Sequence, residues 1–510
     1  MRQRCFSILI LASLVLAPLL IAAPTALRAP THEGVVHTSD QFWSGNMTLD
    51  DDVTIANGAI LTIEAGTQIN VTEDVTITIE GDLDILGTAT EPVTIWGSWV
   101  AETSIQARWQ GFHLDSGSST TVEHANISDS RGGFDLESGA SMSIQSTTLI
   151  DNIIGVWAKG SLSGEGLACE SATTSCLRVD GTVILDEVSS THSAEVIHIH
   201  GGGDANIALT SSVGDAAVIV LDDASTFYGE VHADGFTRLI RGSGSVTATI
   251  MPTEFSGGDV LVEAESLSGL LIPDAHCGTH CTVNSLITGS IEDVEFRSLF
   301  FTCQSDTPCI DAEIDGDLKF VGAWPSTEIY TNGTFARLRG TGAVHANQLS
   351  LYSNGALFDV SGSGEVNIDD STLRFESGGI LSGWSFNINH TILVAQENGL
   401  VLLDVDATIS SVEIARSFSS SDSTSVGLRA VWSDILIDDV SITGWHEGVR
   451  CESECSISSD ELTAGGGGRN SGSGVTIDGG SMVVDTLNTS ASNVGVNIVD
   501  GMLHVGEWNV

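Results

Sequence analysis

Short apolar and polar residues alternate along the sequence from about residue 42 to its end. The pattern is clearest in the last quarter, where segments that begin at Gly427, Gly448, Gly474 and Gly495 are spaced by 21, 26 and 21 residues. Aligned on these glycines, the segments share apolar columns two positions apart. The columns are Leu428, Val449, Val475 and Val496, and then Ala430, Cys451, Ile477 and Ile498. Alternation with a period of two predicts β-strands that turn every second side chain towards a common interior.

The same phase extends back through the chain, in residues 133–144, 155–166, 176–188, 309–321 and 356–368. A repeat near 21 residues is too short for a four-stranded propeller blade, and the asparagine signature of leucine-rich repeats is missing. It suits one coil of a parallel β-helix, and roughly twenty coils would form a rod on the order of 100 Å long. We therefore predict an all-β, right-handed parallel β-helix with coils of about 21–23 residues.

Three segments near the start carry a family resemblance. "GAILTIEAGTQINV" (58–71), "GDLDILGTATEPVTIW" (81–96) and "WQGF" (109–112) resemble the entry coils of secreted right-handed parallel β-helix repeat proteins, which share the pectate-lyase-like fold. Together with the repeats, the resemblance covers nearly all of the chain from about residue 42. It implies the fold but not the function, because this fold serves enzymes, adhesins and unassigned surface proteins.

The two ends predict how the chain is organised. Arg2 and Arg4 precede an apolar run over residues 6–23, which is typical of a signal peptide within residues 1–29, with an uncleaved anchor as the alternative. No second long apolar run follows, so we expect the mature chain not to span a membrane. We assign residues 30–110 to an N-terminal cap and entry coils, and 111–510 to β-helix coils. The last residues stop inside a repeat, and one hypothesis is that the sequence is a fragment of a longer protein.

The charge balance narrows the choice of partners. Asp and Glu total 67 against 18 Lys and Arg, a net charge of −49, while 41% of residues are hydrophobic. So acidic a surface repels nucleic acid and anionic membranes, and it suits high salt or bound divalent cations such as calcium. The apolar content argues against disorder. We expect no required cofactor, and partners among extracellular glycans or cell-surface components.

The cysteines after residue 29 fall into four close pairs, which predicts disulfides in an oxidising compartment. The pairs are Cys169/Cys176, Cys277/Cys281, Cys303/Cys309 and Cys451/Cys455. Because His276 and His280 flank one pair in "HCGTHC", a zinc site is the alternative there. The other pairs recur without histidines, so we favour disulfides throughout. A second histidine pair, His198 and His200, lies on one strand face, and we interpret it as an ordinary exposed pair.

Catalytic motifs of the polysaccharide-cleaving β-helix enzymes are not evident. Paired aspartates occur, but Gly-His-Gly and Arg-x-Lys motifs do not. A lyase needs acidic residues for calcium and a basic residue beside the uronate. The surviving candidates are Arg429, Arg450, Asp438, Asp439 and His446. Arg429 and Arg450 share a repeat phase and should point outward from neighbouring coils. The alternative is that both arginines form surface ion pairs with Glu452 and Asp434.

These observations favour a secreted or cell-surface structural or adhesive protein, with a polysaccharide lyase or glycoside hydrolase as the alternative. Six Asn-x-Ser/Thr sequons would mark outward positions if the host glycosylates secreted proteins. They begin at Asn46, Asn70, Asn126, Asn332, Asn389 and Asn488.

Overall fold

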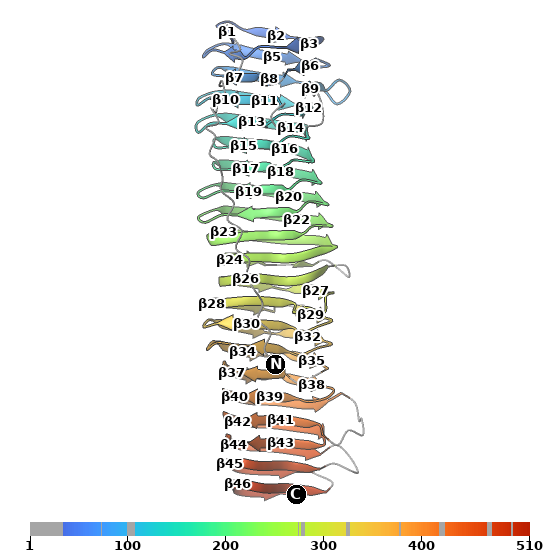
Figure 1. The fold of residues 1–510 in the computed structure, drawn as a ribbon, viewed down its shortest axis with the longest axis vertical. Helices are drawn as coiled ribbons and strands as arrows, with labels where there is room; N and C mark the ends of the chain where they lie inside the picture. Colours follow the sequence, from blue (N-terminus) through green and yellow to red (C-terminus); the bar gives the residue numbers. More distant parts are fainter. Residues whose placement is uncertain are drawn as a thin grey trace, which may run out of the picture.

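The chain winds into an elongated stack of about twenty β-coils (Figure 1). The structure is a computed structural model that describes residues 34–72, 74–98, 108–273, 275–276, 281–322, 327–376, 379–417, 424–466, 472–490 and 493–510. Forty-six strands and no helix occur in these residues. The predicted all-β parallel solenoid is confirmed.

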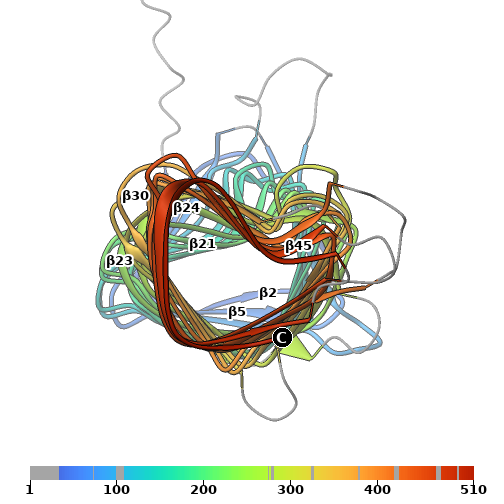
Figure 2. The same cartoon turned by 90° about the horizontal axis from the view of Figure 1, so that it is seen from below.

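Each coil contributes strands to three parallel sheets that enclose one interior (Figure 2). In one coil, β10 (Gly111–Leu114), β11 (Ser119–Glu123) and β12 (Ala125–Ser128) follow one another around the stack. In the next coil, β13 (Gly132–Leu136) pairs with β10, and the longer β14 (Ser141–Ile150) pairs with both β11 and β12 because it continues around the corner. Every pairing is parallel, as stacking of coils of one hand requires.

One of the three sheets, here the first sheet, carries the features discussed below. After β10 and β13 it contains β15 (Ile154–Ala158), β17 (Ser175–Val179), β19 (Glu195–Ile199), β21 (Ala217–Leu221), β23 (Arg238–Ser256), β24 (Gly258–Ile272), β26 (Thr282–Arg297), β28 (Ile310–Val321), β30 (Ala336–Gly340) and β33 (Phe358–Val360).

The register matches the columns predicted from the sequence. In β41 (Val426–Val431), β43 (Glu447–Glu452), β45 (Ser473–Thr489) and β46 (Val494–Asn509), Leu428 pairs with Val449, Val449 with Val475, and Val475 with Val496. These strands continue the first sheet, which reaches them from β33 through β36 (Gly379–Ser382) and β39 (Leu400–Leu403). From β10 onward, paired residues of the first sheet lie 20 to 28 positions apart, with the longest offset between Leu400 and Leu428. Coils longer than the predicted 21–23 residues therefore keep the strands in register and place the extra residues at corners.

The interior is a continuous apolar column. Trp109, Trp384 and Trp445 are fully buried, and Phe112 stacks on Phe134 of the next coil with ring centroids 5.1 Å apart. Burying a large apolar side chain contributes about 1.5–3 kcal/mol, so the repeated inward columns supply the main stabilisation. Buried polar residues cluster at corners, where Asn152 holds the backbone of the preceding coil through its side-chain amide.

Three of the four predicted cysteine pairs are bridged, each within one corner. The Cα atoms lie 5.7 Å apart in Cys169–Cys176, 5.6 Å in Cys303–Cys309 and 5.7 Å in Cys451–Cys455. Cys281 is also disulfide-bonded, while Cys277 lies outside the described residues, as does His280 of the zinc alternative. No helix long and apolar enough to cross a membrane is found in the part of the chain that the structure describes.

Candidate functional site

Two rows of outward side chains run along the first sheet and define a surface that we name the ladder face. The parallel register brings one residue from each coil into each row. The central row is His113, Asp135, Trp157, Arg178, His198, Val220, Arg241, Glu263, Thr288, Asp311, Arg337 and Asp359. The second row, two positions later in the ten coils from β13 to β30, is Glu137, Lys159, Asp180, His200, Asp222, Ser243, Glu265, Ser290, Glu313 and Arg339.

Basic groups gather on the ladder face although they are scarce in the chain. Five of the 18 lysines and arginines lie in these two rows, so the local balance of charge is far closer to even than in the chain as a whole. The cations pair with carboxylates of neighbouring coils. Arg337 Nε lies 3.0 Å from Asp359 Oδ2 in the next coil, and Arg337 Nη1 lies 3.5 Å from Asp311 Oδ2 in the preceding coil. The ladder face therefore presents hydrogen-bond donors and acceptors side by side.

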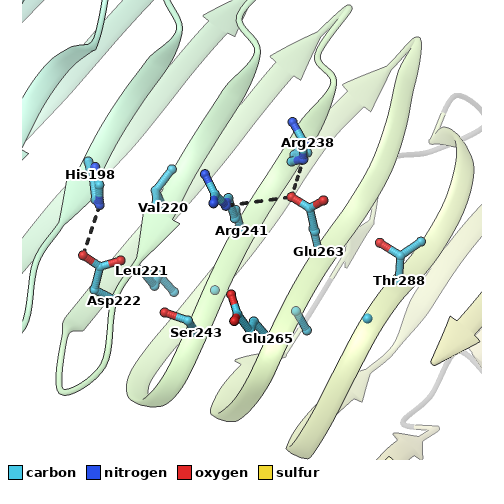
Figure 3. Close-up of a pocket in the computed structure, with 13 residues that line it drawn as sticks. His198, Val220, Leu221, Asp222, Arg238, Arg241, Ser243, Glu263, Glu265 and Thr288 are labelled. Carbon is cyan, nitrogen blue, oxygen red and sulfur yellow. Dashed lines mark hydrogen bonds and ion pairs between the residues drawn. The ribbon is translucent and has the colours of Figure 1, made fainter. Parts of the chain in front are cut away.

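A pocket of about 660 Å³ opens in the middle of the ladder face (Figure 3). Arg238 and Arg241 converge on Glu263 from the preceding coil, with Arg238 in direct contact and Arg241 Nε 3.9 Å from Glu263 Oε2. His198 and Asp222 bound the opposite end, and Glu265 lies exposed at the rim. Carboxylates, guanidinium groups and an imidazole thus surround a space large enough for part of a small polar ligand.

Histidine protonation in this pocket is set by neighbouring carboxylates. His198 Nδ1 lies 2.9 Å from Glu195 Oε2 and its Nε2 lies 3.2 Å from Asp222 Oδ2. Burial alone would lower the pKa of His198, but these two carboxylates outweigh burial and raise it. For His200, burial and the positive charges of His198 and Arg178 lower the pKa. The two rings, stacked with centroids 4.0 Å apart, thus differ in their affinity for a proton.

Trp157 forms an aromatic platform two coils before the histidines. Lys159 Nζ lies 4.1 Å and Arg178 Cζ 4.3 Å from the ring centroid, and the indole Nε1–H donates to Asp180 at 2.5 Å. Burial alone would lower the pKa of Lys159, but its hydrogen bonds to Glu137 and Asp135 raise it. Both cations lie within cation–π distance of the half-buried ring, a geometry that fixes the ring on the face.

The two predicted arginines lie side by side but form an ion-paired cluster. Arg429 and Arg450 are direct register partners on β41 and β43. Arg429 Nη2 lies 2.7 Å from Glu452 Oε2, and Arg450 contacts Glu452 and lies 3.3 Å from Glu447. Burial alone would lower the pKa of Arg450, yet its carboxylate partners raise it. The alternative of surface ion pairs is therefore confirmed for Glu452, but among the described residues Arg450 pairs with Glu447 and Asp478 rather than with Asp434.

The other predicted candidates lie apart from these arginines. Asp438 and Asp439 belong to β42 (Asp434–Trp445), which pairs with β40 (Asp406–Arg416) and β44 (Ser456–Gly466) in another sheet. The small pocket beside Arg429 and Arg450 is not lined by Asp438, Asp439 or His446 in the described part of the chain. The described residues that line this pocket therefore do not include the set of acids, arginines and histidine that a lyase would need.

The remaining sequence candidates divide into sugar-attachment and metal positions. All six sequon asparagines lie outside the core: Asn46 and Asn332 are exposed, and Asn70, Asn126, Asn389 and Asn488 are half-buried. Three groups among the described residues have three ligand atoms close enough for one metal ion, and each includes a histidine. They are His198, His200 and Asp222; His113, Asp135 and Glu137; and Asp369, Asp370 and His390. The histidine pair predicted to be ordinary and exposed is instead half-buried and part of a cluster with Asp222.

Two comparisons with known proteins were negative. No protein-family model matches the chain, and no curated protein is significantly similar to it. The pectate-lyase-like resemblance therefore stands on the fold and the quoted segments alone.

Sequence reasoning missed the ladder face because each coil contributes only one residue to each row. The phase alignment that placed Arg429 beside Arg450 contained the necessary signal. Extending it upstream would have aligned Trp157, Arg178 and His198 in one column.

Proposed function

We propose that the chain is a secreted or cell-surface β-helical scaffold that binds glycan chains along its ladder face. The observation that carries this proposal is the register itself. It assembles paired cations, carboxylates and a tryptophan from separate coils into one straight ribbon. Extended polar ribbons of this kind suit a ligand that is itself a linear polymer of hydroxyl groups, because charged groups make strong, directional hydrogen bonds.

The remainder of the molecule supports an extracellular role. Disulfide-bridged corners persist in oxidising compartments, and the N-terminal residues have the composition of a signal peptide. A rod of closely stacked coils keeps the ladder face straight, so binding does not first have to order the protein. We infer neutral glycans as the first class to test, because the net charge of −49 repels polyanions at a distance.

Glycan binding can be tested with a matched pair of tryptophan variants. Trp157 lies on the ladder face, whereas Trp432 is 61% exposed and directly follows β41, several coils beyond the last residue of the ladder face. Affinity for a panel of neutral and acidic glycans would be measured by calorimetry for the intact chain and for each variant. We expect Trp157→Ala to weaken binding about fivefold, since stacking on one aromatic ring contributes about 1 kcal/mol, and Trp432→Ala to leave it unchanged. Absence of binding, or equal losses in both variants, would overturn the proposal.

The pocket favours one alternative, a polysaccharide-cleaving enzyme of the same fold. Glycoside hydrolysis requires two carboxyl groups across a bound sugar, and Asp222, Glu263 and Glu265 line one space. Release of new reducing ends, with and without calcium, distinguishes this function from binding alone. Turnover that is lost in Glu265→Gln would place the activity in the pocket, whereas binding without turnover leaves the scaffold function in place.

A further inference from the structure

One carboxylate oxygen on the ladder face contacts the ring nitrogens of two histidines. His198 is on β19, His200 directly follows that strand, and Asp222 directly follows β21 of the next coil. Asp222 Oδ2 lies 3.2 Å from His198 Nε2 and 2.9 Å from His200 Nδ1. The His-x-His spacing puts both rings on the same side of the strand, and the parallel register brings the aspartate opposite them.

A neutral cluster cannot satisfy all of these contacts. Both nitrogens of His198 face carboxylate oxygens, because Nδ1 lies 2.9 Å from Glu195 Oε2. A neutral imidazole has one N–H and one lone pair, so one of the two contacts would join a lone pair to a carboxylate oxygen. With both carboxylates ionised, the arrangement therefore requires a positive charge at its centre, which is supplied either by a proton on His198 or by a bound cation.

We propose that His198, His200 and Asp222 bind a divalent transition-metal ion of the zinc class, independently of whether the ladder face binds glycans. The ligand atoms are His198 Nε2, His200 Nδ1 and an Asp222 carboxylate oxygen. In tetrahedral zinc sites, bond lengths near 2.0–2.1 Å separate neighbouring ligand atoms by about 3.3 Å. The observed separations of 2.9 and 3.2 Å need only small side-chain movements to reach that value. Two imidazoles favour zinc, copper or nickel over calcium.

The residues around the cluster supply the support that metal-bound histidines require. Glu195 accepts the Nδ1–H of His198 and thereby directs the Nε2 lone pair to the ion. His200 Nε2 and Asp180 Oδ1 are both buried without a hydrogen-bond partner, and the register places Asp180 beside His200 in the preceding coil. A metal on His200 Nδ1 fixes the proton on Nε2, and Asp180 is the carboxylate that the register places beside this ring. Three protein ligands leave a fourth position for water or a ligand in the pocket.

A comparison with a similar cluster shows why this group stands out. Asp135 and Glu137, with His113, already hold the ammonium group of Lys159, whose Nζ lies 2.9 Å and 2.6 Å from the two carboxylates. That cluster therefore contains its own counter-charge. Among the described groups, the charges facing His198 and His200 are Glu195 and Asp222, with Arg178 and Asp180 from β17 and the residue after it. Three carboxylates therefore surround the two histidines, against one permanently charged cation, Arg178.

The test is zinc binding by the intact chain after treatment with a chelator. Competition against a chromophoric zinc indicator gives the stoichiometry and affinity, and cobalt gives a visible spectrum that reports coordination geometry. We expect one tight zinc ion per chain, little binding of calcium at this site, and weaker zinc binding as the pH falls, because protons compete for His198 and His200.

Variants distinguish a specific set of metal ligands from nonspecific zinc binding by a surface histidine. His200→Gln and Asp222→Asn should abolish the tight site and its cobalt spectrum, and Glu195→Gln should weaken it about 10- to 100-fold. His390→Gln, in a more exposed cluster, is the control and should leave binding unchanged. Circular dichroism would establish that each variant is folded. A chain that takes up no zinc, or that binds it equally well in folded His200→Gln, would overturn the proposal.

Discussion

Asn152 offers a quantitative test of how corners hold the ladder face. It lies between β14 and β15, is 1% exposed, and its side chain joins two coils. Oδ1 accepts the backbone N–H of Ser130 at 2.9 Å and the Ser130 hydroxyl at 2.6 Å, while Nδ2 donates to the Ile127 carbonyl at 3.0 Å. Asn152→Ala would therefore leave one buried backbone donor and one buried acceptor unsatisfied.

The expected loss follows from those two groups. A buried polar group without a partner costs about 1–3 kcal/mol, so the variant should lose about 2–6 kcal/mol of local stability. In a solenoid this loss is confined to the affected coils and their neighbours, because each coil contacts only the adjacent ones. The strand that carries Trp157 begins two residues after Asn152, so the ladder face should loosen there first.

Hydrogen exchange followed by mass spectrometry measures this loss coil by coil. A destabilisation of about 2 kcal/mol should accelerate exchange of the β13 and β15 amides about 30-fold, with β41 and β43 unchanged. Asn126→Ala is the matched control, because Asn126 is half-buried on the outward side of β12, where a substitution costs about 0.5 kcal/mol or less. Equal exchange in the two variants would refute the argument that buried corner amides hold the coils together.

Three further predictions concern protonation, backbone geometry and disulfides. In metal-free protein, protonated His198 should stabilise β19 fully below its unfolded-state pKa of about 6.5, and this stabilisation should fade as the pH rises through its raised folded-state pKa. The protection factors of the β19 amides, which correct for the base-catalysed rise of intrinsic exchange with pH, should therefore fall above pH about 6.5 in the wild type but not in His198→Gln. Gly111→Ala should fail to give soluble protein, because a Cβ there would lie 1.5 Å from a carbonyl oxygen of the next coil, whereas Gly117→Ala, also at positive φ but in open space, should fold with a loss of about 1–2 kcal/mol. Reducing Cys451–Cys455 should destabilise its corner by about 2 kcal/mol, and alkylation without reductant should label neither cysteine.

The sequence predicted the interior of this protein far better than its surface. Period-two alternation is imposed by burial, so Leu428, Val449 and Val475 could be aligned before the register was known. Corner lengths were not predictable to the residue, because an enlarged corner costs little and leaves the strands in phase.

The candidate site was harder to predict for the same physical reason. Outward residues are not constrained by a common interior, and the members of the ladder face are about twenty positions apart in the chain. Pairs close in sequence, such as Asp438 and Asp439, are easily recognised as candidates, but their strand belongs to another sheet. The His-x-His spacing of His198 and His200 is visible in the sequence, but Asp222 joins them only through the pairing of β19 with β21.

Arginine footprinting with a bound glycan tests the central claim most directly. Arg241 and Arg337 lie exposed on the ladder face, and Arg374 lies exposed on another sheet, where it packs over Tyr352. Each would be modified with an arginine-specific reagent in the presence and absence of a glycan selected from the binding panel. The proposal predicts that the glycan protects Arg241 and Arg337 and leaves Arg374 reactive. Protection of Arg374 with continued reactivity of Arg241 and Arg337 would contradict it.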